Sequence, residues 1–146
     1  MIGLLQRVSS ASVEVDGATI ACIEQGLLVL VGVERMDTPQ SAERLLQRLV
    51  GYRVFSDAQG KMNLSVREVQ GGLLLVPQFT LAADTRKGTR PSFSPATTPE
   101  RGRELFEYLV QFAMTLHPRV AAGRFAAQMQ VALVNDGPVT FWMRVD

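Results

Sequence analysis

Leu27-Leu28-Val29-Leu30-Val31-Gly32-Val33, residues 27–33, is the longest apolar run in this chain of 146 residues. It follows a break at Gln25-Gly26 and consists mainly of leucine and valine, which is typical of a strand in a protein core. The run is far too short to cross a bilayer as a helix. We therefore expect a buried strand over these residues.

The residues before this strand predict a β-hairpin. Ser12–Val15 alternates polar and apolar residues, Asp16-Gly17 is a favoured hairpin turn, and Thr19–Ile23 continues the strand pattern. Cys22 lies within this apolar pattern, and we expect it to be a small core side chain.

Two helices are predicted after the apolar strand. Thr38-Pro39 and Thr98-Pro99 each place a hydroxyl side chain before a proline at the first helical position. Apolar residues then recur on one face of both segments, as an amphipathic helix requires. These residues are Ala42, Leu45, Leu46, Leu49 and Val50 in the first helix, and Leu105, Leu109, Phe112, Ala113 and Leu116 in the second.

The remaining segments predict short strands and one long loop. The strands are Tyr52–Phe55, Gly72–Val76, Gln128–Val134 and Val139–Val145, with a turn at Asp57-Ala58-Gln59-Gly60. Residues 82–98 are rich in Gly, Pro, Ser, Thr and charge, and loops of this length are usually functional. We predict a single α/β domain over residues 1–146, of the α+β kind. Its sheet is mostly antiparallel with two main helices and is not doubly wound.

Composition excludes several classes of protein. Hydrophobic residues make up 47% and charged residues 20%, which suits a soluble globular domain. The net charge of +1 lacks the strongly basic character of a protein that holds duplex DNA. The single cysteine excludes an internal disulfide, and no signal peptide is visible. We expect a cytoplasmic protein with no membrane and no DNA partner.

The usual catalytic groups are missing. His117 is the only histidine, so a histidine-rich metal site is impossible, and its place before Pro118 favours a helix-end or surface role. The chain has no phosphate-binding glycine loop, no dinucleotide-binding fingerprint and no obvious carboxylate pair. We expect neither a metal nor a cofactor.

Three features remain as candidates. Pro77-Gln78-Phe79-Thr80-Leu81 follows an apolar strand and could present an amide and a hydroxyl to a ligand, although Thr80 could simply cap a turn. Gly137-Pro138 interrupts two strands, either as an ordinary trans turn or as exposed backbone that sorts substrates by shape. Arg86, Lys87 and Arg90 form a basic cluster that could equally be a solvated loop.

Six stretches, in order, resemble the bacterial D-aminoacyl-tRNA deacylases along essentially the whole chain. They are Gln6-Arg7-Val8-Ser9-Ser10-Ala11-Ser12-Val13, Gly26–Glu34, Gly60-Lys61-Met62-Asn63-Leu64-Ser65, Gln78–Gly88, Arg90-Pro91-Ser92-Phe93 and Asn135-Asp136-Gly137-Pro138-Val139-Thr140. The resemblance implies a small barrel-like α/β fold and a two-fold homodimer with its active sites at the interface.

The resemblance also implies residue roles. Gly137 and Pro138, joined by a cis peptide bond, enter the pocket of the other subunit as a chiral filter, and Arg7 holds them in place. The pocket itself is lined by the catalytic segment Gln78-Phe79-Thr80. Phe125 and Met129 flank the terminal adenine of the tRNA, where a base can stack on the aromatic ring.

The implied reaction is hydrolysis of the ester between tRNA and a D-amino acid or glycine. An activated ester needs orientation, a placed water and oxyanion stabilisation, and the 2′-hydroxyl of the RNA is expected to assist. We expect Thr80 to position the substrate, because no base is visible that could activate it as a nucleophile. Rigid backbone in the pocket would reject L side chains. Arg86, Lys87 and Arg90 could contact acceptor-stem phosphates.

Two residues depart from the family pattern. Pro77 stands where serine is usual, and Ala126 stands where glycine is common and could crowd the adenine pocket. A non-catalytic tRNA-binding homologue is therefore an alternative. Another is an esterase of small acylated metabolites with Thr80 as nucleophile.

Overall fold

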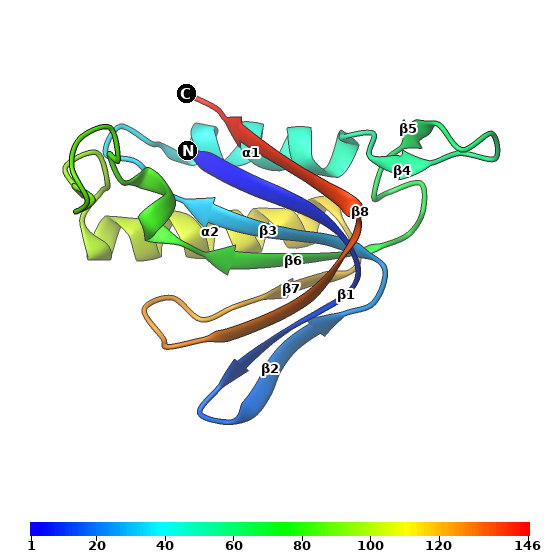
Figure 1. Cartoon of the computed structure of the whole chain (residues 1–146), viewed down its shortest axis with the longest axis horizontal. Helices are drawn as coiled ribbons and strands as arrows, with labels where there is room; N and C mark the ends of the chain where they lie inside the picture. Colours follow the sequence, from blue (N-terminus) through cyan, green and yellow to red (C-terminus); the bar gives the residue numbers. More distant parts are fainter.

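The predicted apolar strand is β3 (Gly26–Gly32), and it lies at the centre of a curved sheet (Figure 1). In the computed structural model, which describes residues 1–146, β3 pairs antiparallel with β1 (Ile2–Val15) and parallel with β6 (Gly72–Pro77). The strand order is β2-β1-β3-β6-β7, with β8 (Gln130–Arg144) also paired to β1. The remaining members of this sheet are β2 (Ala18–Ile23) and β7 (Val120–Ala122).

The two sides of β3 and β6 enter different apolar clusters, because successive strand side chains point to opposite faces. Val29 and Leu75 join the larger cluster, which contains both helices. Leu28 and Leu74 join the smaller cluster, which is covered by the second half of β1, by β2 and by the partly buried start of β8. The sheet therefore curls over one of its own faces and carries helices on the other, which confirms the predicted α/β class and its barrel-like form.

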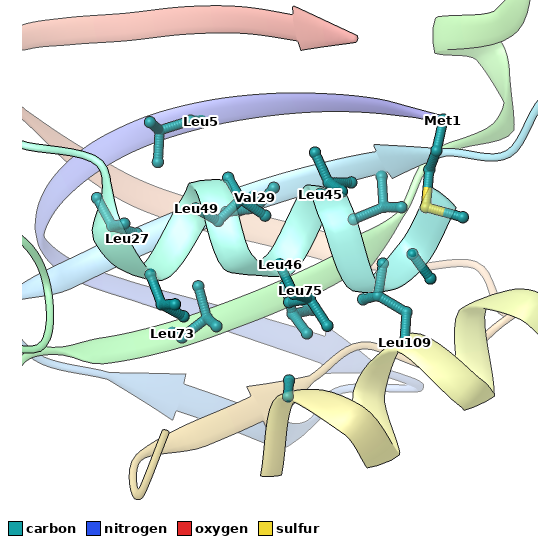
Figure 2. Close-up of a cluster of buried hydrophobic side chains, with 14 of the residues drawn as sticks. Met1, Leu5, Leu27, Val29, Leu45, Leu46, Leu49, Leu73, Leu75 and Leu109 are labelled. Atoms are coloured by element: carbon teal, nitrogen blue, oxygen red, sulfur yellow. The ribbon is translucent and has the colours of Figure 1, made fainter. Parts of the chain in front are cut away.

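Both predicted helices form, and their N-terminal caps are the predicted threonines. Thr38 and Ser41 make a reciprocal capping box at the start of α1 (Pro39–Gly51). The Thr98 hydroxyl accepts a hydrogen bond from the Arg101 N–H at the start of α2 (Pro99–Leu116). Figure 2 shows the apolar face of α1, with Leu45, Leu46 and Leu49 packed among side chains of β1, β3, β6 and α2.

Two sequence predictions about strands are corrected. The two predicted C-terminal strands form one continuous element, β8, because β1 pairs with it on both sides of an interruption. The strand predicted at Tyr52–Phe55 begins later, as β4 (Phe55–Ser56), because Tyr52 is the C-terminal cap of α1. β4 pairs with β5 (Met62–Leu64). The prediction of a mostly antiparallel sheet is confirmed. Its parallel pairs are β3–β6 and β6–β7, because helical crossovers connect these strands.

Two side chains also differ from expectation. Cys22 is exposed, because β2 alternates and Ala21 occupies the buried face. His117 is the C-terminal cap of α2, as expected for a helix end, but it is buried, with Nε2 2.7 Å from the Gly71 carbonyl oxygen. No helix is both long enough and apolar enough to cross a membrane.

Candidate active site

The segment Gln78-Phe79-Thr80 lies where β6 leaves the sheet. The Gln78 N–H donates to the Val31 carbonyl at 2.7 Å, and the chain then forms the 3-10 turn η1 (Phe79–Ala82). Gly32 permits this close approach, because a Cβ there would lie 2.9 Å from the Leu81 Cβ. The turn is therefore fixed against the end of β3.

The polar side chains of this segment, half-buried Gln78 and exposed Thr80, face each other. The Gln78 side-chain amide donates to the Thr80 hydroxyl. Phe79 is 60% exposed, and its ring centroid lies 5.2 Å from that of Phe93 in the following loop. The segment thus presents an amide, a hydroxyl and an aromatic wall on the surface, as a binding site for a small polar group requires.

The only side-chain hydrogen-bond partner of the Thr80 hydroxyl is the Gln78 amide, whose N–H donates to it and cannot act as a base. His117 contacts Gly71, at the opposite end of β6, roughly 20 Å from Thr80 at about 3.3 Å per strand residue. No group of three or more His, Cys, Asp or Glu side chains lies close enough to hold a metal ion. The geometry therefore favours a positioning role for the hydroxyl.

The segment Gly137-Pro138 forms an exposed bulge in β8. The β8 register steps from Val8↔Asn135 to Gln6↔Thr140, so that the residues between 135 and 140 stand opposite Arg7 alone. The Gly137–Pro138 peptide bond is cis, and Gly137 has φ +138°.

Hydrogen bonds clamp this bulge from both sides. The Asn135 side-chain oxygen accepts from the Val139 N–H at 3.0 Å, and its amide donates to the Thr140 hydroxyl at 2.8 Å. Arg7 Nε donates to the Asp136 carbonyl at 3.0 Å, and Nη1 donates to the Val54 carbonyl at 2.7 Å. The bulge is consequently a rigid backbone feature, as a steric filter needs.

The two segments do not meet within one chain. In the sheet register, Arg7 aligns with Leu27 and Leu73, whereas Gln78 follows Pro77, which aligns with Val31. Five residues along the strand and three strand spacings separate them, which amounts to roughly 20 Å. Figure 1 shows the same arrangement: β8 bends at one side of the sheet and β6 ends at the other.

The residues expected to flank the adenine lie in the connection between β7 and β8. The Phe125 ring packs 6.3 Å from Phe106, and the Met129 sulfur lies 2.9 Å from where a Cβ on Gly123 would sit. Ala126 is exposed and has φ +62°. The backbone conformation explains why glycine suits this position, since a left-handed φ is strained for alanine.

The basic cluster lies in the exposed loop after η1. Arg86 forms a bidentate pair with Asp84, with distances of 2.9 and 2.6 Å. Hydrogen bonds from Arg86 lower the pKa of Asp84 to about 2. Lys87 and Arg90 are exposed and form no ion pair, so they are freer than Arg86 to meet a phosphate.

Comparisons with known proteins agree with this architecture. The family model described as "D-Tyr-tRNA(Tyr) deacylase" matches residues 4–144. A D-aminoacyl-tRNA deacylase of Pseudomonas fluorescens is 65% identical over 144 residues, covering 99% of each chain. One from Ralstonia nicotianae is 62% identical, covering 99% of this chain and 90% of the relative.

Two solved structures share the fold. One titled "c-Myc DNA Unwinding Element Binding Protein" has a TM-score of 0.95 and 34% identity, and the match covers 100% of this chain and 99% of that one. One titled as a probable eukaryotic D-amino acid tRNA deacylase has a TM-score of 0.85 at 16% identity, and the match covers 99% of this chain and 98% of that one. At this identity the match supports the fold alone. The chain therefore belongs to the D-Tyr-tRNA(Tyr) deacylase family and is an enzyme of the D-aminoacyl-tRNA deacylase class, a hydrolase.

Proposed function

We propose that this enzyme acts as a homodimer on D-aminoacyl-tRNA, and on glycine mischarged on tRNA(Ala), in the cytoplasm where tRNA is charged. Each active site combines Gln78-Phe79-Thr80 of one subunit with Gly137-Pro138 of the other. The observation that carries this proposal is the separation of roughly 20 Å between the two segments within one chain. One aminoacyl group is too small to touch both unless a second subunit supplies one of them.

The free edge of β8 supports a two-fold partner. β8 pairs only with β1, so its other edge is open, and open edges readily pair with a second chain. Val134 and Trp142 on this strand are 57% and 58% exposed and leave apolar surface that a partner could cover. A symmetric contact through this strand would cover them.

Catalysis then depends on how the site positions the ester and the attacking water. Water adds to the ester carbonyl, the acyl C–O bond breaks, and the ribose oxygen leaves with a proton, assisted by the neighbouring 2′-hydroxyl. Gln78 and Thr80 orient the aminoacyl group, and backbone N–H groups at the start of η1, which lack partners inside the turn, stabilise the developing oxyanion. Phe125 and Met129 hold the terminal adenine, and Lys87, Arg90 and Arg86 contact the acceptor stem.

The enzyme selects D-aminoacyl groups because its site rejects L side chains. The Gly137-Pro138 backbone, clamped by Arg7 and Asn135, forms a wall that cannot yield to an L side chain. A D side chain points elsewhere, and glycine has none, so both substrates pass. Purified enzyme should hydrolyse D-Tyr-tRNA and Gly-tRNA(Ala) and spare L-Tyr-tRNA. Tight tRNA binding without turnover of any of these would favour a non-catalytic homologue instead.

Subunit complementation tests the shared site directly. Phe79→Ala damages the pocket and Gly137→Val damages the filter, and each homodimer should be impaired. Mixed subunits form heterodimers in which one site has an intact pocket and an intact filter. Equal mixing should therefore restore about one quarter of the wild-type sites. Recovery of no activity, or a fully active monomer, would refute the shared site.

A further inference from the structure

A groove of about 370 Å³ lies between α2 and the connection from β7 to β8. Arg103, Glu107 and Gln111 line its helical wall, and Arg124 and Phe125 line the opposite wall. Its volume falls in the range of small-ligand sites. None of the catalytic or filter residues lines it.

The groove is continuous with the candidate active site. Gly123 lines it, and a Cβ on Gly123 would lie 3.3 Å from Pro77 Cδ and 2.9 Å from Met129 Sδ. Pro77 directly precedes the Gln78-Phe79-Thr80 segment, and Met129 is expected to flank the adenine. Figure 1 places the end of β6 and the β7–β8 connection on the same side of the sheet. A chain that enters the site can thus extend along the groove.

The lining combines cations with an aromatic face. The Arg103 guanidinium lies 5.3 Å from the centroid of the Phe125 ring. The Arg124 side chain is exposed and makes no hydrogen bond or ion pair, so it is free to meet an anion. Basic side chains beside an aromatic ring are the usual means of binding single-stranded nucleic acid. The carboxylate of Glu107, 3.8 Å from Arg103 Nη1, disfavours a second phosphate but can accept a hydrogen bond from a base amine.

We propose that this groove binds the cytidine that precedes the terminal adenosine of the tRNA, which ends in a single-stranded CCA. This proposal rests on the proposed function. Arg124 meets the phosphodiester between the two nucleotides, and Glu107 accepts from the exocyclic amine of the cytosine. Recognition of this second nucleotide helps to hold the aminoacyl end in register.

The test compares D-tyrosyl esters of adenosine, of the dinucleotide CpA and of UpA. For the wild type, kcat/KM for the CpA ester should exceed that for the adenosine ester roughly tenfold, as a charge-assisted hydrogen bond provides. It should also exceed that for the UpA ester about tenfold, because uracil offers an acceptor to Glu107 where cytosine offers a donor.

Two pairs of variants locate the effect. Arg124→Gln should lower the CpA-to-adenosine ratio but keep the preference for CpA over UpA, and Glu107→Gln should remove the preference for CpA over UpA. Arg101→Gln and Glu104→Gln are the matched controls, because these residues pair with each other on α2 outside the groove. Both controls should keep the wild-type ratios.

A CpA ester no better than the adenosine ester, or a CpA-to-adenosine ratio that Arg124→Gln leaves unchanged, overturns the proposal. Calorimetry measures the affinities for CpA and adenosine, and so tests binding in the groove independently of catalysis. If no ester is hydrolysed, the proposed function fails, yet CpA must still bind more tightly than adenosine to the wild type and lose part of that advantage in Arg124→Gln.

Discussion

Replacement of Arg7 by alanine should destabilise the protein and loosen the filter bulge together. The Arg7 side chain is only 13% exposed and donates to two carbonyls, those of Val54 and Asp136. Val54 is buried, so its carbonyl would lose its partner without gaining water. A hydrogen bond from a charged group contributes roughly 1.5–3 kcal/mol. The Asp136 carboxylate is 57% exposed, and its 3.6 Å ion pair adds little.

We therefore expect Arg7→Ala to lower the free energy of unfolding by about 2–3 kcal/mol. Urea denaturation at a fixed protein concentration measures this value, and the hydrolysis of L-Tyr-tRNA reports any loosening of the filter. Arg53→Ala is the control, because Arg53 is exposed and its side chain makes no hydrogen bond. Equal stabilities of the two variants would refute this account of Arg7.

Three further predictions concern the filter, the basic loop and the core. Gly137→Ala should lower kcat/KM for D-Tyr-tRNA by at least about tenfold, because its Cβ would lie 2.7 Å from Val139 Cγ2 at φ +138°. The Asp84 carboxyl should titrate near pH 2 by NMR and at a higher pH in Arg86→Ala, because the guanidinium hydrogen bonds are lost while the backbone N–H of residue 86 still donates. The depressed pKa means that the pair stabilises the loop above pH 3.8 and is lost as the pH falls through about 2. Leu46→Ala, at a fully buried site, should cost about 2–5 kcal/mol of unfolding free energy.

Their controls are equally specific. Gly51→Ala adds a Cβ with no atom within 4 Å, so its deacylase activity should match the wild type. Gln47→Ala, beside Leu46 but exposed, should change stability by less than about 0.5 kcal/mol. An Asp84 midpoint that is the same with and without Arg86 would exclude the ion pair as the cause of the pKa shift.

Local patterns predicted the elements whose causes are local. Thr38-Pro39 and Thr98-Pro99 predicted both helix starts, because a cap and a proline act within one turn. Asp16-Gly17 predicted the hairpin turn, where both residues have positive φ. The burial of Cys22 was predicted wrongly, because alternation alone does not say which side of an edge strand meets the core.

The family resemblance named the site residues, but sequence spacing could not place them. Gln78 and Gly137 are distant in sequence, and their distance in space depends on the register of β6, β3, β1 and β8. The groove at Arg124 was missed for the same reason, because its opposite wall is supplied by α2. A site formed by two segments that are distant in sequence leaves no pattern in either segment alone.

The order of residues is enough to predict the class of the fold, the starts of its helices, the buried strand at its centre and the family to which it belongs. These properties follow from side-chain periodicity, capping and ordered motifs, each of which acts over a few residues. The three-dimensional fold was needed to show that β8 runs through Gly137-Pro138 as one strand and that Gly137-Pro138 lies roughly 20 Å from Gln78-Phe79-Thr80 of its own chain. Strand pairing and sheet curvature are set by contacts between distant segments, which no local pattern encodes.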